Sequence, residues 1–593
     1  MYNPNECIRL VRMHRPQVAG KGMAEAKLQF GVMCHGTTLE AWEARCLHKL
    51  LEVPGVELAL LIVEGQPAAP PPGRRPLRAL RNLLLGRSTL WDLYMLWARP
   101  RLASRRPVTM AGKLAGVPTL ECQPIQDESG AWRLDEADLQ RIREHRLSFI
   151  LRFGGDMLRR VTIDAAEHGV WSFRHHYTPG RRHGLPGFWE VYDRAAIIET
   201  SLERVTDRPD RAVVLQRGAF RAELGLNGYV HNHDKAAFAS ALWPARVCRD
   251  LLYGEASYLR AAPAPVTPFV HRQPAAWQAL VFLLRSAQDE LRIKLNWLFR
   301  EEQWNVGYSP TPIHRLLERP ELSDVRWYPA SPRHEFLADP IALDRDGHIT
   351  VMAEHYDYRT RKGRLMALSF DHGHPAGTAA LALEEPWHLA YPLLVQDGPS
   401  LYCIPEGSDS GRVWAYRAQE FPHTWQRVGP LLDHAQVVDP TVFRHEDRWW
   451  MLGMPTGEYP EQGFVQLHAW YADGLLGPWT AHHCNPLKLD VRNSRPAGPV
   501  FRHEGRLYRP AQDCSGRYGS AIAINEVLHL SPSRFEERTV ARLAPSPDWP
   551  YPAGVHTLCA VDGGVVLDAR RMIFVPRCFK ERLRELLRDK GER

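Results

Sequence analysis

Residues 337–343 read Leu337-Ala338-Asp339-Pro340-Ile341-Ala342-Leu343, a polar turn that leads into an apolar run. The pattern recurs through the second half of the chain at intervals of about 50 to 60 residues, and a second β-like run follows most copies. Repeats of this length with several strands each predict an all-β five-bladed propeller over residues 301–575, closed by a strand near residues 304–306. The further copies are Leu389-Ala390-Tyr391-Pro392, Val437-Val438-Asp439-Pro440, Pro496-Ala497-Gly498-Pro499 and a degenerate Val555-His556-Thr557.

The motif also predicts a site, because the first strand of every propeller repeat lines one central channel. We predict catalytic roles for Asp339 and Asp439, since crowded carboxylates raise one another's pKa as acid and base catalysis requires. Capping of strand ends is the structural alternative for these residues. The same motif position holds Tyr391, Gly498 and His556, and the second strands contribute Glu354, Glu406 and Asp513, with Met454 in the third repeat. The predicted substrate-binding set is Glu354, Tyr391, Glu406, Arg495, Gln512, Asp513 and His556.

These repeats resemble the five-bladed propellers of the glycoside hydrolase clan that includes arabinanases and β-xylosidases. In that family an Asp-Pro turn supplies the base and a second Asp-Pro tunes a pKa, and Asp339 and Asp439 match these positions. The family's general acid is a Glu just before a Gly-Pro pair, where this sequence has Ala497. The resemblance therefore implies a sugar-related centre that lacks, at its usual place, one of the two carboxylates used in glycoside hydrolysis.

A second resemblance covers roughly residues 304–543 and is more specific. The ordered motifs look like the N-terminal domain of glucosamine inositolphosphorylceramide transferases, whose plant members carry a separate glycosyltransferase domain after the propeller. In this sequence only a basic segment, predicted to be helical over residues 576–593, follows the propeller. The resemblance therefore implies a role with glycans or glycoconjugates, and not the transfer activity of the separate glycosyltransferase domain. The motifs are 334–340 (HEFLADP), 388–392 (HLAYP), 404–406 (IPE), 509–514 (RPAQDC) and 518–519 (YG).

The first half of the chain predicts an α/β domain with a parallel sheet over residues 25–254. A strand at 28–32, a helix at 39–51 with apolar residues at helical spacing, and a strand at 56–63 form a βαβ unit. Further predicted elements are a helix at 135–145 and strands at 148–153 and 169–173. Residues 255–300 predict a Pro-rich linker followed by a helix.

Residues 29–63 and 148–220 resemble the formyltransferase fold of methionyl-tRNA and sugar N-formyltransferases. In that family an Asn-x-His strand end and a later Asp form the catalytic set. By position, Ser172 stands for the Asn, Arg174 for the His with His175 one residue later, and Asp210 for the Asp. The resemblance implies formyl transfer from formyl-tetrahydrofolate to an amine by Ser172, His175 and Asp210.

Composition narrows the class of protein. The net charge of +7 over 593 residues is mild and dispersed, so no nucleic-acid partner is predicted. Ten scattered cysteines form no CxxC pair, which predicts reduced thiols and no metal site. Apolar runs are too short for a membrane span and no signal peptide is visible, so we predict a cytoplasmic protein. The basic cluster at 181–183 is predicted either to bind an anion or to be only solvated. The arginines at 74–81 are predicted to form a solvated face.

The leading hypothesis is a transferase that modifies an amino sugar or related amine of a glycoconjugate precursor by N-formylation, with the propeller holding the sugar. One alternative places glycosyl transfer or hydrolysis in the propeller, using Asp339 with Glu406 or Asp513. A second alternative is a non-catalytic protein that recognises a glycan. The sequence does not indicate an oligomeric state.

Overall fold

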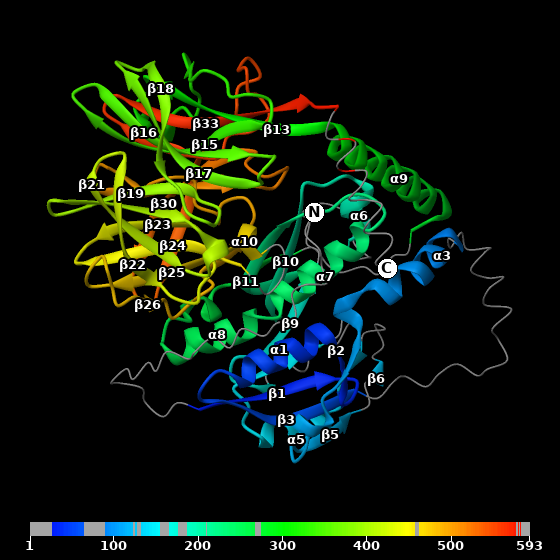
Figure 1. Ribbon diagram of the computed structural model, residues 1–593. Coiled ribbons are helices and arrows are strands. Elements are labelled where there is room, and N and C mark those ends of the chain that lie inside the picture. The colour runs from blue at the N-terminus through cyan, green and yellow to red at the C-terminus, as the bar shows by residue number, and fades with distance from the viewer. Residues whose placement is uncertain are drawn as a thin grey trace. The chain divides into compact units, whose positions relative to one another are not determined.

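The structure is a computed structural model, shown in Figure 1. It describes residues 27–64, 89–122, 125–126, 132–153, 165–175, 187–208, 210–266, 274–456, 462–576, 579 and 582. The chain divides into two compact units, one within Gln17–Arg292 and one within Ile293–Arg593. The arginine stretch at 74–81, the basic cluster at 181–183 and most of the basic segment at 576–593 lie outside the described residues.

The N-terminal unit begins with the predicted βαβ element. Strand β1 (Leu28–Cys34) is followed by β2 (Thr38–Glu40), helix α1 (Ala41–Leu51) and strand β3 (Val56–Glu64), and β1 pairs with β3 in parallel. Trp42, Cys46 and Leu50 are buried on one side of α1, as their spacing predicted. In Figure 1, α1 lies over one face of this sheet.

The sheet of this unit is mixed, whereas the sequence predicted a parallel one. A parallel part continues into an antiparallel hairpin, because a short turn can join two strands only in antiparallel order. The parallel strands are, in order, β5 (Thr119–Cys122), β3, β1, β8 (Phe149–Arg152) and β9 (Val170–His175). The antiparallel strands are β10 (Ile197–Val205), β11 (Arg211–Arg221) and β12 (Ala264–Pro265).

An aromatic core joins the helices of the N-terminal unit. The ring of Phe282 on the long helix α9 (Ala276–Phe299) packs against Trp91, Tyr94 and Phe188 at centroid distances of 4.9 to 5.6 Å. The first part of α9 therefore belongs to this unit, which extends to Arg292 rather than to the predicted end at residue 254. No described helix is both long and apolar enough to cross a membrane. The other main helices are α3 (Thr89–Ala98), α5 (Glu136–Glu144), α6 (Phe188–Tyr192), α7 (Gly228–Ser240) and α8 (Trp243–Leu252).

The C-terminal unit consists of small antiparallel sheets in a propeller-like arrangement. Four of the sheets seen within the described residues have four strands each. They are β15–β18 (Glu335–Arg345, His348–Asp357, Lys362–Asp371, His374–Leu383), β19–β22 (Ala390–Asp397, Ser400–Glu406, Val413–Glu420, Thr424–Leu432), β28–β31 (Phe501–His503, Arg506–Asp513, Ala521–Leu530, Phe535–Leu543) and β14-β13-β33-β32 (Arg326–Trp327, Arg300–Ser309, Gly564–Phe574, Leu558–Val561). A further antiparallel ladder contains β23–β26 (Val437–His445, Arg448–Pro455, Gln466–Ala472, Thr480–Ala481), and β27 (Lys488–Asp490) pairs with β25.

The first long strand of this unit pairs with the last one. Strand β13 runs antiparallel to β33 with Trp304 opposite Arg570, and the two lie side by side in Figure 1. The sequence predicted a strand at residues 304–306, and these residues lie in β13. The pairing ties the two ends of the repeat array together, so the sheet it forms contains residues separated by more than two hundred positions.

The first three repeat motifs form β-bulges with unusual backbone geometry. Asp339, Tyr391 and Asp439 have positive φ angles of 51°, 43° and 49°, and the strand register shifts at each of them. The left-handed conformation is disfavoured for residues with a Cβ, so it is kept only where the surroundings enforce it. The following proline lacks an N–H and leaves no ladder donor unpaired at the bulge.

The fourth repeat has Gly498 at this position, with a φ of 120°. A Cβ at Gly498 would lie 2.1 Å from the backbone oxygen of Leu558. We expect Gly498→Ala to destabilise the C-terminal unit by at least about 3 kcal/mol, because a backbone clash adds to the conformational strain. The free energy of unfolding from urea denaturation measures this loss. Gly505→Ala is the matched control: its φ is 75° with nothing within 4 Å of a Cβ, so it should lose only about 1 kcal/mol.

Candidate functional site

The bulges direct polar side chains to one buried cluster in the centre of the C-terminal unit. Asp339, at the first bulge, donates its backbone N–H to Oδ2 of Asp568 at 2.9 Å. Its own carboxylate accepts the Thr557 hydroxyl at 2.8 Å. All three residues are buried, and the contacts join β15 to the last strands of the unit.

The His556 imidazole lies between two carboxylates. Its Nε2 is 3.4 Å from Oδ1 of Asp339 and its Nδ1 is 2.7 Å from Oδ2 of Asp568. Burial by itself lowers the pKa of His556, but the carboxylates of Asp568 and Asp339 raise it above its ordinary value. The donor atoms of these three residues lie within 4.8 Å of one another, close enough to bind a metal ion. However, each ring nitrogen faces a different carboxylate, which suits an imidazolium better than a common ligand set for one ion.

Asp439, at the third bulge, accepts hydrogen bonds from two buried side chains. The Arg495 guanidinium donates to it from Nε at 2.5 Å and from Nη2 at 3.3 Å. Gln512 Nε2 donates to the same carboxylate at 3.0 Å. The Asp439 backbone N–H donates to Oε2 of Glu406 at 3.2 Å, so Asp439 is tied to the second repeat by its backbone and to the fourth by its carboxylate. Two donors on one carboxylate fix its orientation.

Tyr391, at the second bulge, is fully buried and bridges its neighbours through its hydroxyl. The hydroxyl lies 2.8 Å from Thr441 Oγ1 and accepts the backbone N–H of Gly498 at 2.8 Å. Tyr391 therefore joins the second repeat to the third and fourth repeats.

Glu354 and Glu406 add two buried carboxyls. Burial raises the pKa of each well above its ordinary range, and neighbouring carboxylates add to the shift. Arg495 lowers the pKa of Glu406 but does not offset the burial. Nε2 of the half-buried His388 lies 3.5 Å from Glu354. Burial also raises the pKa of Asp339 to about 6, although His556 lowers it. The cluster thus combines two carboxyls whose pKa is raised well above the ordinary range with one whose pKa is about 6.

Asp513 lies outside this cluster, in contrast to the prediction that grouped it with Glu354 and Glu406. Its carboxylate accepts Arg542 Nε at 2.8 Å and the Ser515 N–H at 2.9 Å. Gln512, the preceding residue, reaches Asp439 instead. Successive residues of a strand point to opposite faces, so a register difference of one residue moved the predicted carboxylate to the wrong side.

Aromatic rings cover the cluster. Trp304 stacks on His556 with ring centroids 4.0 Å apart, and Tyr518 meets His556 edge-on at 5.1 Å. The Arg495 guanidinium lies 4.9 Å from the Tyr518 ring and 5.3 Å from that of Phe464. Tyr518 and Phe464 are half-buried, whereas the carboxyls below them are buried. Aromatic rings beside hydroxyl-binding carboxyls are a combination suited to a sugar, which has apolar and polar faces.

The predicted site of the N-terminal unit is not assembled in the same way. Arg174, at the position of the family's His, donates from Nε to both carboxylate oxygens of the buried Glu203, at 3.0 and 2.9 Å. Ser201 donates to that carboxylate as well, at 2.7 Å. Arg174 is therefore committed to an ion pair within the sheet. Ser172 lies two residues before Arg174 on β9, where it is the strand partner of Glu203 on β10.

His175 and Asp210 are far apart. His175 Nε2 lies 3.0 Å from Ser240 Oγ, and its ring packs edge-on against Trp42. His175 pairs with Thr200 on β10, whereas Asp210 lies in the turn beyond Val205, where β10 ends. The position of His175 beside β10 and the end of β10 near Asp210 are therefore about 16 Å apart along the strand. Asp210 is exposed and ion-paired with Arg208 at 3.3 Å, a contact that lowers its pKa. The structure therefore does not bring together the predicted set of Ser172, His175 and Asp210.

Several members of the central cluster were not predicted from the sequence. Asp568, in the apolar run of β33, binds three backbone N–H groups, those of Asp339, His556 and Thr557. A carboxylate inside a buried strand was the available signal, because such a charge requires partners. Thr441 and Trp304 carried no comparable signal, since their types are common in strands.

Comparison with known proteins finds similarity over part of the chain. The family model described as "Glucosamine inositolphosphorylceramide transferase 1, N-terminal" matches residues 320–547. The glucosamine inositolphosphorylceramide transferase 1 of Oryza sativa subsp. japonica is 30% identical over 258 residues, which cover 40% of this chain and 34% of that protein. That of Arabidopsis thaliana is 31% identical over 205 residues, covering 34% and 27%. The chain thus spans about a third of the length of the curated relatives it matches.

Solved structures also match parts of the chain. A thermostable family-43 glycoside hydrolase has a TM-score of 0.29 and 14% identity, covering 36% of this chain and 77% of that one. Glycinamide ribonucleotide transformylase 1 from Symbiobacterium toebii has a TM-score of 0.26 and 13% identity, covering 39% and 89%. Scores this low carry no argument about fold or function.

The raised pKa of Asp339 predicts a pH dependence of stability. Because the folded state holds this proton to about pH 6 and the unfolded chain only to about pH 4, ionisation destabilises the fold as pH rises between these values. Asp339→Asn keeps an acceptor for Thr557 and cannot ionise. We expect the unfolding free energy of the variant, relative to wild type, to rise by up to about 3 kcal/mol from pH 4 to pH 7 in urea titrations.

Asp210→Asn is the matched control for this measurement. The pKa of Asp210 is lowered by Arg208, so wild type should gain slightly over this variant as pH rises through the carboxyl range. A difference for Asp339→Asn that stays constant with pH would show that Asp339 ionises at an ordinary pKa.

Proposed function

We propose that the C-terminal unit binds the sugar of a glycoconjugate at the central cluster, and that the protein is a transferase acting on such a glycoconjugate. The observation that carries the proposal is the convergence of Asp339, Glu354, Glu406 and Asp439 with Arg495 in one buried centre. The similarity of this unit to proteins named for glucosamine and inositolphosphorylceramide supports the same substrate class. We also infer that the β23–β26 ladder is the third of five blades in a closed ring.

The residues divide into acid and base roles. With a pKa of about 6, Asp339 is mostly ionised at neutral pH and accepts a proton from an attacking hydroxyl. Glu406 has a raised pKa, remains protonated, and donates to the leaving group in place of the glutamate that Ala497 replaces. Asp439, held by Arg495 and Gln512, orients the sugar. Asp513 has no part in this chemistry, because it pairs with Arg542.

Activity assays on the full chain test this proposal. With a nucleotide-activated glucosamine as donor and an inositol-phosphate glycolipid as acceptor, we expect Asp339→Asn and Glu406→Gln to lower transfer by at least about 100-fold. Asp513→Asn, a matched carboxyl outside the cluster, should retain transfer. The measurement is product formation at neutral pH, with the unfolding free energy of each variant as a check on folding.

Binding measurements separate the proposal from non-catalytic recognition. Titration calorimetry with a glucosamine-containing glycoside should show binding to wild type that weakens in Asp439→Asn, because this carboxylate lies at the centre of the cluster. Binding without turnover of any donor would favour the recognition hypothesis. Absence of both binding and transfer would contradict the proposed function.

Formyl transfer from formyl-tetrahydrofolate by the N-terminal unit stays a separate prediction. If the unit transfers a formyl group to an amino sugar, we expect His175→Gln to abolish the reaction, since His175 lies at the end of β9 next to Ser240. Asp210→Asn should leave it unchanged, because Asp210 lies in the distant turn. Loss of formyl transfer in both variants would restore the predicted catalytic set.

A further inference from the structure

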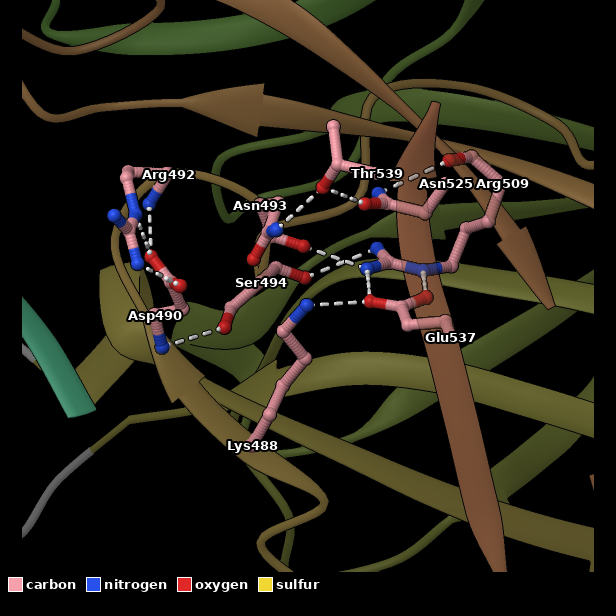
Figure 2. Close-up of polar contacts among 9 residues, drawn as sticks. All are labelled: Lys488, Asp490, Arg492, Asn493, Ser494, Arg509, Asn525, Glu537 and Thr539. Atoms are coloured by element: carbon pink, nitrogen blue, oxygen red, sulfur yellow. Dashed lines mark hydrogen bonds and ion pairs between the residues drawn. The ribbon is translucent and has the colours of Figure 1, made fainter. Parts of the chain in front are cut away.

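A buried ion cluster lies at the base of the loop that carries Arg495 (Figure 2). Arg509, fully buried on β29, donates from Nε and Nη2 to the two carboxylate oxygens of Glu537 on β31, at 2.9 and 2.7 Å. Lys488 of β27 donates to the same carboxylate at 2.6 Å. Burial raises the pKa of Glu537, but Arg509 and Lys488 together lower it to about 2. Glu537 is therefore ionised throughout the neutral range and holds Arg509 in a fixed plane.

The same guanidinium also binds the loop backbone. Arg509 donates from Nη2 to the carbonyl oxygen of Asn493 at 2.6 Å and from Nη1 to that of Ser494 at 3.2 Å. The Asn493 side chain donates to Thr539 Oγ1 at 2.8 Å, and Thr539 donates to Asn525 Oδ1 at 2.7 Å. Asn525 Nδ2 donates to the Arg509 carbonyl oxygen at 3.3 Å, so the contacts form a closed circuit (Figure 2).

This circuit ends where the central site begins. The Ser494 carbonyl belongs to the same planar peptide unit as the Arg495 N–H, so Arg509 holds the peptide unit that precedes Arg495. On the other side, the Arg495 carbonyl oxygen accepts the Gln512 N–H at 2.7 Å. With both flanking peptide units held, the Arg495 guanidinium reaches Asp439 at 2.5 Å.

We propose that Arg509, oriented by Glu537, is a positioning residue that holds the Arg495 guanidinium on Asp439 in the central cluster. Its effect on sugar binding or transfer rests on the proposed function, whereas its effect on Arg495 does not. Stability alone accounts poorly for the cluster, because buried ion pairs contribute little net stability compared with apolar residues of similar size. A planar guanidinium can bind a carboxylate with one edge and two carbonyls with its remaining donors, which an ammonium group cannot do.

Arg509→Lys tests the proposal, because it keeps the charge opposite Glu537 and removes the fork that binds the loop. In the full chain labelled with ¹⁵N-arginine, hydrogen exchange at Arg495 Nε–H reports whether the Asp439 contact persists. We expect exchange to be at least about tenfold faster in Arg509→Lys than in wild type, as a loosened contact opens more often. Arg538→Lys is the matched control, since Arg538 is an exposed neighbour on β31 paired with Glu526; Arg495 exchange should not change.

A milder variant covers the case in which Arg509→Lys does not fold. Thr539→Val removes the hydroxyl that joins Asn493 to Asn525 without changing any charge or the side-chain volume. It should speed Arg495 exchange in part, by a few-fold. Unchanged Arg495 exchange in a folded Arg509→Lys protein, or in Thr539→Val if the former does not fold, would overturn the proposal.

The exchange measurement needs no ligand, so it separates this proposal from the proposed function. If wild type binds the glucosamine glycoside, Arg509→Lys should weaken binding about tenfold and Arg538→Lys should not. If wild type binds no sugar, the proposed function fails, and faster Arg495 exchange would still establish Arg509 as a positioning residue.

Discussion

The left-handed backbone at the start of the inner strands is the constraint on which the C-terminal unit depends. Asp339, Tyr391 and Asp439 adopt positive φ angles at bulges, and each precedes a proline. This conformation is unfavourable for a residue with a side chain, so it is kept by contacts made elsewhere. Those contacts are the hydrogen bonds between repeats, such as Asp339 to Asp568 and Tyr391 to Gly498. The strained turns and the central polar cluster therefore depend on each other.

Charge balance decides what the cluster can do. Five buried carboxyls, those of Asp339, Glu354, Glu406, Asp439 and Asp568, lie near one buried guanidinium and one buried imidazole. Burial raises the pKa of Glu354 and Glu406 well above the ordinary range, and neighbouring carboxylates add to the shift. The carboxyl groups of the cluster thus acquire different pKa values from their surroundings alone. Such differences are typical of acid and base sites. The loop that carries Arg495 is central to this balance, because it brings the guanidinium to Asp439.

The two units differ in how well sequence patterns predicted their sites. In the C-terminal unit the repeat placed Asp339, Tyr391 and Asp439 correctly, because like-numbered positions of a repeat take like positions in space. Both Gln512 and Asp513 were predicted at the site, and the pattern did not resolve the one-residue register that directs only Gln512 to Asp439. In the N-terminal unit, the resemblance implied that Ser172, His175 and Asp210 meet in one catalytic set, although they are separated along the chain. The hairpin of β10 and β11 instead places Asp210 at the end away from His175.

The sequence by itself determined the βαβ start of the N-terminal unit, the strand-rich repeat of the C-terminal unit and the turns that carry its carboxylates. These features follow from local periodicity and from residues such as Pro340 and Gly498, whose backbone preferences act over a few positions. Only the tertiary structure decided that Asp568 joins Asp339, that Arg174 is paired with Glu203, and that Arg509 binds the loop of Arg495. Those contacts join residues that are distant along the chain, and a buried charge takes its partner and its pKa from whatever the fold places beside it.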